Sequence, residues 1–217
     1  MQEDQITAYL QSHPEFFEKN ANLLADIHLP SPHGNGAISL VERQQLAQRD
    51  KINALEERYV ELVLNAQDND QITNKLHQFF VLLQKAKSFD VIEQLINHKL
   101  VENFNITDTC LRIWASPIDS KDAGSLAFSA TPESTHTWVN DIQAVYCGES
   151  PTNINVDDWF VTPANSIAVM PLKTESVYGY LALASEEKGR FHVSTGIDFL
   201  QKLGDHVSAA LSRHVVE

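Results

Sequence analysis

The stretch from Ser39 to about Lys87 constrains the fold more than any other part of the sequence, because it has the properties of one unbroken helix. Ser39 and Glu42 have the spacing of a capping box, in which each side chain bonds to a free backbone N–H of the first turn. Neither glycine nor proline follows until Pro117. At about 1.5 Å per residue, such a helix would span roughly 70 Å, which exceeds one small domain.

Apolar residues recur along this helix at alternating spacings of three and four, which is typical of a face that packs against another helix. The residues of this seam are Ile38, Val41, Ile52, Leu55, Tyr59, Leu62, Ala66, Leu76, Phe80 and Leu83. Polar residues interrupt the seam at Gln45, Gln48, Asn69 and Thr73. We therefore expect a helical partner, held less tightly than in an ideal zipper.

Two partners agree with this pattern. The seam can pack on the N-terminal helices of its own chain, or it can pair with the same helix of a second chain in a parallel homodimer. The length of the seam favours the homodimer, because the apolar segment of residues 16–27 covers only part of it. The expected subunit interface consists of Ile52, Leu55, Tyr59, Leu62, Ala66 and Leu76.

The charge of the chain argues against two classes of partner. Of its 217 residues, 16 are Lys or Arg and 29 are Asp or Glu, which gives a net charge of −13 with histidine neutral. This balance repels phosphate backbones and anionic lipids, so we expect neither nucleic-acid nor membrane binding. The acidic, polar start differs from a signal peptide, and no run of about eighteen apolar residues occurs, so we expect a cytoplasmic protein.

Residues 1–37 predict short helices and a connector. Residues 2–12 have helical apolar spacing, and Pro14 suits the first position of a second helix. This second helix is more apolar than so small a unit can bury alone, so it must pack on the long helix or on a partner. Residues 28–36 are rich in proline and glycine, as connectors are. The long helix would then occupy residues 38–87.

Residues 88–217 predict an α+β domain with an antiparallel sheet flanked by helices. We expect helices at 88–103, 131–145 and 195–214, and strands at 109–114, 124–130, 146–148, 166–172 and 178–184. Capping side chains are expected at Ser88 with Asp90 and at Thr195 with Asp198. The last two strands form a hairpin that is apolar on both faces, which is typical of the centre of a covered sheet. Gly179 within it predicts a bulge or a close backbone approach.

The order of these elements, with the hairpin "SIAVMPLKTESVYGYLALAS" followed by "RF" and a long helix, resembles the GAF domain, a small-molecule sensor fold. The whole chain is also similar to a bacterial family, the domain of unknown function 484 proteins. The similarity lies in "YLQSHPEFFEKNANLL", "ISLVERQ" and "RF…FLQKLGDHVSAAL". The resemblance implies a GAF-like fold with a helical N-terminal extension, and it implies no particular ligand, cofactor or reaction.

A candidate ligand site follows from the strand at residues 109–114, where Arg112 and Leu111 lie on opposite faces. If the Leu111 face is core, Arg112 faces the long polar loop of residues 149–165 and can bind a carboxylate or phosphate of a small molecule. The residues that could form the apolar walls of such a pocket are Trp114, Trp138, Tyr146, Trp159, Phe160, Met170 and Tyr180. In the alternative, Arg112 pairs with a local carboxylate and the aromatic residues are ordinary core.

Three functions remain open. A sensor or regulatory protein that signals through a homodimeric helix predicts an enclosed cavity beside Arg112. A dimeric adaptor that binds a protein partner predicts a filled cavity and an exposed apolar helical patch. A thiol-dependent reductase needs Cys110 and Cys147 close together or near a base. The sequence identifies no cofactor, and its histidines lack a zinc-site spacing.

Overall fold

The computed structural model of the chain describes residues 3–30, 37–156, 158–192 and 196–216. The chain divides into two compact units, Met1–Gln67 and Asp68–Glu217. Their boundary lies inside the long helix, about twenty residues before the position expected from the sequence, because the last turns of this helix pack into the C-terminal core.

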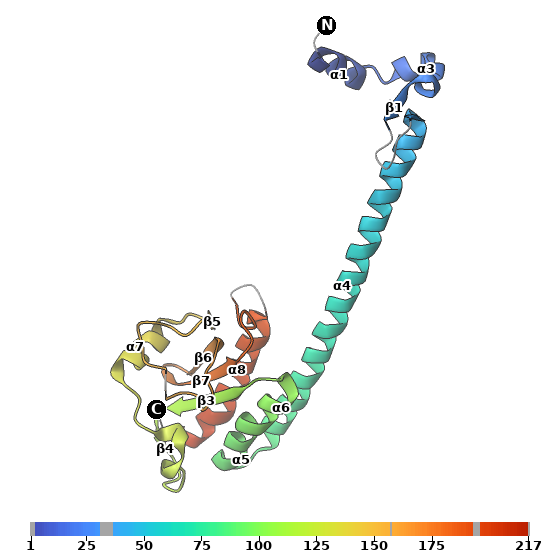
Figure 1. The fold of residues 1–217 in the computed structure, drawn as a ribbon. Helices are drawn as coiled ribbons and strands as arrows, with labels where there is room; N and C mark the ends of the chain where they lie inside the picture. The colour runs from blue at the N-terminus through green and yellow to red at the C-terminus, as the bar shows by residue number, and fades with distance from the viewer. Residues whose placement is uncertain (1–2, 31–36, 157, 193–195, 217) are drawn as a thin grey trace. The chain divides into compact units, whose positions relative to one another are not determined.

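The N-terminal unit contains short helices, a two-stranded ladder and the first part of the long helix (Figure 1). Its elements before the long helix are α1 (Glu3–Ser12), α2 (Glu15–Lys19), α3 (Ala21–Asp26), β1 (His28–Pro30) and β2 (Ala37–Ser39). Pro14 directly precedes α2, as its fixed backbone angle predicts. The antiparallel pair of β1 and β2 was not predicted, because the composition of this segment indicates only a connector.

The long helix α4 covers Leu40–Lys85, which confirms the predicted helix to within two residues at each end. It begins directly after Ser39. The side chain of Ser39 lies outside the described side chains, so the capping box stays a prediction. The unbroken length of α4 follows from the absence of glycine and proline throughout this part of the chain.

The next helical segment consists of α5 (Phe89–Gln94), η1 (Leu95–Leu100) and α6 (Val101–Phe104). The predicted helix at residues 88–103 is therefore confirmed to within one residue at each end, although the turns of η1 are π-helical. Ser88 stands at the N-cap position, but its side chain makes no capping hydrogen bond. The segment ends at Asn105, whose φ of 50° is left-handed and directs the chain into the sheet.

Four antiparallel strands form the sheet of the C-terminal unit, in the order β3-β7-β6-β5. Their bounds are β3 (Asp108–Ile113), β5 (Tyr146–Gly148), β6 (Ser166–Lys173) and β7 (Val177–Ser185). The predicted central hairpin is confirmed, since β6 and β7 pair with each other and are buried over nearly their whole length. The predicted edge strand β5 is also confirmed.

Helices cover both faces of this sheet (Figure 1). The helix α8 (Ile197–Leu211) packs on β6, and together with the α5–α6 segment it encloses the larger core. The helix α7 (Glu133–Asp141) covers the opposite face. A short ladder joins β4 (Ser116–Pro117) to β8 (Val215–Val216) after η4 (Ser212–His214). Thr195, the predicted cap of α8, lies outside the described residues, and Gly196 precedes the helix with a φ of 70°.

The predicted strand at residues 124–130 is wrong. This segment forms two 3₁₀ turns, η2 (Asp122–Gly124) and η3 (Leu126–Phe128). The Ser125 hydroxyl accepts a hydrogen bond from the Ala127 backbone N–H, which favours a local turn over pairing with a strand. Phe128 then packs on Phe89, with ring centroids 4.9 Å apart.

Gly179 lies where β7 approaches β3 most closely. It pairs with Ile113, and a Cβ atom on it would lie 2.4 Å from the Arg112 carbonyl oxygen. The predicted close approach is therefore confirmed. The predicted fold class, α+β with an antiparallel sheet flanked by helices and preceded by a long helix, is confirmed as well.

Candidate functional site

The strand β3 places Leu111 and Arg112 on opposite faces of the sheet, as predicted. Leu111 and Ile113 are buried in the core beneath α8, and Cys110 lies on the other face with Tyr180. Because Arg112 pairs with Tyr180 across the strands, the two side chains belong to this second face. The pocket predicted beside Arg112 should therefore open on this second face of the sheet.

Aromatic residues on this second face pack against one another and cover the sheet. Tyr180 is fully buried beneath Trp159, with ring centroids 4.5 Å apart. Trp138 contacts both Trp159 and Tyr146, with centroids at 6.3 and 5.1 Å. Phe160 contacts Trp159 edge-on at 6.3 Å. Apart from Met170, the residues expected to form the walls of a cavity therefore belong to the second core cluster of the domain or pack against it, as the adaptor hypothesis requires.

Arg112 makes a local contact. Its Nη1 donates to the Leu111 carbonyl oxygen at 2.9 Å, and among the described residues it forms no ion pair. The alternative in which Arg112 pairs with a local carboxylate is thus not realised in this part of the chain. Burial, reinforced by the neighbouring Cys110, raises the pKa of Tyr180 well above its ordinary value, so this phenol is neutral.

Trp114 contacts a residue that the sequence did not single out. Its ring stacks on His136 of α7 with centroids 4.2 Å apart, and its Nε1 donates to the Val177 carbonyl oxygen at 3.0 Å. The buried Nε2 of His136 has no hydrogen-bond partner within the described part of the chain. No spacing signal links these two residues, since they meet only when α7 folds onto the sheet.

Met170 does not belong to the predicted pocket. It pairs with Leu181 and is buried on the α8 side, where it contacts Gly204. Tyr180 pairs with Pro171 and therefore faces the other way. Because side chains alternate along a strand, Met170 and Arg112 lie on opposite faces of the sheet.

The two cysteines are separated and protonated. Cys110 lies on β3 and Cys147 on β5, which are the opposite edges of the sheet, and they belong to different core clusters. Burial raises the pKa of Cys110 to about 11 and also raises the pKa of Cys147. The two thiols therefore lack the proximity that the thiol-reductase hypothesis asked of them, and burial disfavours the thiolate form of each.

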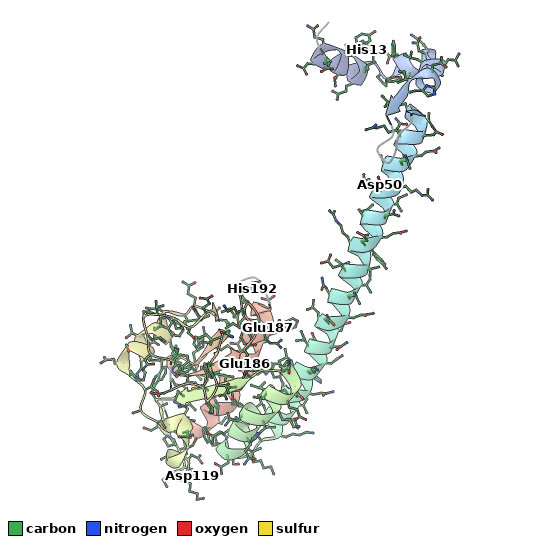
Figure 2. All side chains as sticks on the ribbon, viewed as in Figure 1. His13, Asp50, Asp119, Glu186, Glu187 and His192 are labelled. Atoms are coloured by element: carbon green, nitrogen blue, oxygen red, sulfur yellow. The ribbon has the colours of Figure 1, made fainter. Side chains whose placement is uncertain are left out.

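The seam residues of the N-terminal unit are exposed to solvent. Ile52, Leu55, Tyr59 and Leu62 are all exposed, and the exposed fraction of Leu62 reaches 68%. Ala66 is exposed as well. Figure 2 shows side chains extending to both sides of α4 in this view, near the labelled Asp50. Leu76 differs, because it is 5% exposed and buried in the core of its own C-terminal unit. It is therefore unavailable for the expected subunit interface.

None of the described side chains in the N-terminal unit is buried. Apolar residues of the short helices also stay exposed, as Ile6, Tyr9, Leu23 and Ile27 show. The packing of the seam on the N-terminal helices of the same chain, which the sequence left open, is therefore not seen in this unit.

A pocket of about 250 Å³ lies on the α8 side of the sheet, and we call it the Arg190 pocket. Residues of α4, α6, β7 and α8 line it, together with Ile106, Phe191, Gly196 and Arg190. The sequence gave no reason to select Arg190, which stands in the short segment after β7. Elsewhere, no group of three potential metal ligands occurs among the described residues. None of the helices that the structure describes has the length and apolar character to cross a membrane.

A family model described as "Protein of unknown function, DUF484" matches residues 1–216. The uncharacterized protein YigA of Salmonella typhimurium (strain LT2) is 32% identical over 110 residues, which cover 50% of this chain and 46% of that protein. The match thus spans about half the length of this curated relative.

Two solved structures resemble part of the chain. The GAF domain of the potassium sensor histidine kinase KdpD from Escherichia coli is 16% identical with a TM-score of 0.40, over 64% of this chain and 92% of that one. A methyl-accepting chemotaxis protein, residues 122 to 287, is 14% identical with a TM-score of 0.42, over 62% and 95%. Both TM-scores are below 0.5, so we take no functional conclusion from either structure.

Proposed function

Because the chain belongs to the DUF484 family, whose description assigns no activity, we propose from its geometry that it is a non-catalytic regulatory protein that works as a homodimer. Two copies would pair in parallel along the N-terminal part of α4. Each copy would then present its own C-terminal α+β domain for contact with a protein partner.

The exposed seam is the observation that carries this proposal. Ile52, Leu55, Tyr59 and Leu62 follow the alternating spacing of three and four that aligns side chains along one face of a helix pair. Each large apolar side chain gains about 1.5–3 kcal/mol when it leaves water. A second copy of the same helix offers the matching face in the matching register.

The lack of a core in the N-terminal unit supports the same proposal. A solvated helix gains no tertiary packing, and isolated helices are only marginally stable in water. The described residues of this unit bury no side chain, so its helices need a partner to become stable. The exposed apolar residues of α1 and α3 would add contacts to such an assembly.

The packed aromatic face of the sheet favours a regulatory contact over ligand binding at Arg112. The sensor hypothesis required a cavity there, but Trp159 and Tyr180 pack closely at that place. The close packing of Trp159 on Tyr180 together with the exposed helical patch is the combination expected of a dimeric adaptor. The GAF-like sequence pattern supports the regulatory part of the proposal.

Light scattering after size-exclusion chromatography tests the dimer. We expect the native protein at twice the 24.3 kDa of one chain, and we expect Leu62→Asp to shift it to a single chain. Two Leu62 side chains are lost from the interface, about 3–6 kcal/mol together, so the dissociation constant should rise at least roughly a hundredfold.

Leu64→Asp is the matched control. Leu64 is 55% exposed on the same helix. Because it lies two residues after Leu62, its side chain points away from the seam. This variant should stay dimeric. Native protein that elutes as one chain at every concentration would refute the proposal, and so would equal dissociation of the two variants.

Crosslinking tests the parallel arrangement. Ile52→Cys should form an interchain disulfide on mild oxidation, since equivalent seam positions face each other in a parallel pair. Leu64→Cys should not. The native cysteines are buried and should contribute little to this reaction. Failure of Ile52→Cys to crosslink in a dimeric protein would exclude the parallel pairing.

A further inference from the structure

The Arg190 pocket has the properties of a binding site for a small amphipathic molecule. It lies on the face of the sheet opposite Arg112, and its walls include Leu76, Phe104, Leu183 and Leu203. Every residue that lines it is apolar, apart from Arg190 and Gly196. Water on such apolar walls makes few hydrogen bonds, so an apolar ligand that covers them gains free energy by removing apolar surface from water.

Arg190 is held in place at the pocket, yet its charge is weakly compensated. Its Nη2 donates to the Phe104 carbonyl oxygen at 2.5 Å, which fixes the guanidinium against the end of α6. Its Nη1 lies 3.6 Å from an oxygen of Glu187, which is beyond ordinary hydrogen-bond distance. The Glu187 side chain is 72% exposed, whereas that of Arg190 is only 32% exposed. Figure 2 labels Glu187 beside Glu186.

The exposed Glu187 would compete only weakly with an anionic ligand for the Arg190 guanidinium. Ion pairs between solvent-exposed groups contribute about 0–1 kcal/mol, so a ligand can replace Glu187 at little cost. A ligand carboxylate beside a half-buried guanidinium gains a charge-assisted hydrogen bond in a less hydrated place. The polar end of the ligand should therefore be an anion that a single arginine can neutralise.

The volume of the Arg190 pocket limits the size of the apolar part of the ligand. A dry cavity of about 150 Å³ lined by similar side chains holds one benzene molecule. The 250 Å³ of the Arg190 pocket therefore accommodates a somewhat larger body. At about 30 Å³ for each water-sized group, this volume corresponds to roughly eight such groups.

We propose that the Arg190 pocket binds a monocarboxylate with an apolar body of about six to nine carbon atoms, such as a medium-chain fatty acid. The body would lie between α8 and the end of α4, and the carboxylate would contact the Arg190 guanidinium. A nucleotide or another polyphosphate does not suit this site, because among the described residues that line it Arg190 alone is charged. This inference goes beyond the homodimer and does not depend on it.

Isothermal titration calorimetry of the full chain with sodium octanoate tests the site. We expect saturable binding of one octanoate per chain, for the native protein and for Leu62→Asp alike. Octanol, which has the same body without the charge, should bind more weakly. A lack of saturable octanoate binding at millimolar concentration would overturn the proposal, whatever the oligomeric state.

Substitution of Arg190 tests the role of the charge. Arg190→Gln should weaken octanoate binding at least about tenfold, which is typical of a lost charge-assisted hydrogen bond. Its affinity for octanol should stay unchanged. Arg213→Gln removes the same charge outside the pocket and should have no effect. Equal octanoate affinity of Arg190→Gln and the native protein would overturn the carboxylate contact, as would an equal loss for octanol and octanoate.

A pocket-filling variant tests the place of binding. Leu200 lies on the pocket wall in α8 and is partly buried, so Leu200→Trp should occupy the space and abolish octanoate binding. Circular dichroism establishes that the variant is folded. If it does not fold, Ile72→Trp fills the same pocket from α4. Undiminished binding by a folded filling variant would overturn the assignment.

Discussion

Replacement of Gly179 by alanine should destabilise the C-terminal unit, because the structure leaves no space for the added Cβ atom. The new Cβ would lie 2.4 Å from the Arg112 carbonyl oxygen and 3.2 Å from the Ile113 Cα. Close carbon–oxygen contacts in sheets occur at about 3.3–3.6 Å. The strands β3 and β7 would therefore have to separate by about 1 Å at this pair.

The magnitude follows from what this separation disrupts. The obstructing oxygen belongs to the backbone of a paired strand, so it cannot rotate away as the end of a flexible side chain can. Overpacking of this kind costs about 1–3 kcal/mol. The adjacent hydrogen bond from the Trp114 N–H to the Tyr178 carbonyl oxygen, at 2.9 Å, would weaken by up to about 1 kcal/mol. Alanine also lowers the conformational entropy of the unfolded chain, which stabilises the folded protein by about 0.4–1 kcal/mol. We expect a net loss of about 1–3 kcal/mol.

Urea denaturation followed by tryptophan fluorescence measures this loss. All three tryptophans of the chain lie in the C-terminal unit, so their emission reports on that unit alone. Gly124→Ala is the matched control, because nothing lies within 4 Å of its added Cβ, and it should change the free energy of unfolding by less than about 0.5 kcal/mol. Equal stability of the two variants would show that β3 does not pair with β7 at this register.

Two further predictions concern buried side chains of the same unit. Burial raises the pKa of Cys110 from 9.0 to about 11, so between these values the folded protein binds more protons than the unfolded chain, and stability falls as pH rises. From pH 8 to 11, the native protein should therefore lose about 2–3 kcal/mol more in free energy of unfolding than Cys110→Ala, and parallel urea-denaturation profiles would contradict the burial of this thiol. Leu76→Ala should lower the free energy of unfolding by about 2–5 kcal/mol in the same assay, because Leu76 is a core residue. Leu64→Ala, at an exposed position, should stay within about 0.5 kcal/mol of the native protein.

Long elements with a strong period were predictable from the sequence. The helix α4 ends within two residues of its predicted bounds, because it has no internal glycine or proline and therefore no competing local structure. The hairpin of β6 and β7 was predictable for a related reason, since two apolar runs joined by a polar turn leave few other arrangements. The short ladder of β1 and β2 and the turns at residues 122–128 lacked such a pattern.

The composition of the candidate site was less predictable, because it depends on strand register. Met170 and Tyr180 are both apolar residues of the central hairpin, and the sequence alone does not show which face each of them takes. The observed register pairs Met170 with Leu181 and Tyr180 with Pro171. A shift of one residue would reverse every side chain of a strand, so a site residue can be placed only when the register is known.

Arg190 was not predictable because its role depends on a distant contact. Its guanidinium bonds to the backbone of Phe104, which is 86 residues away in the sequence. Arginine is common near loops, and a single arginine has no spacing signal of its own. By contrast, Arg112 was selected for its place on a strand, but its described hydrogen bond goes only to the neighbouring Leu111 carbonyl oxygen.

The apolar stripe of α4 is exposed in its N-terminal part and buried in its C-terminal part, which explains why Leu76 was wrongly assigned to a subunit interface. Ile52 to Leu62 are exposed, whereas Leu76 and Leu83 continue the same spacing and are buried in the C-terminal core. The change follows the polar seam positions Asn69 and Thr73, close to the boundary between the two units. Periodicity alone shows that a stripe must be covered, but it does not say by what. The core residues around Leu76 come from segments far along the chain, so only the folded structure separates the half of the stripe that the C-terminal unit covers from the half that is exposed.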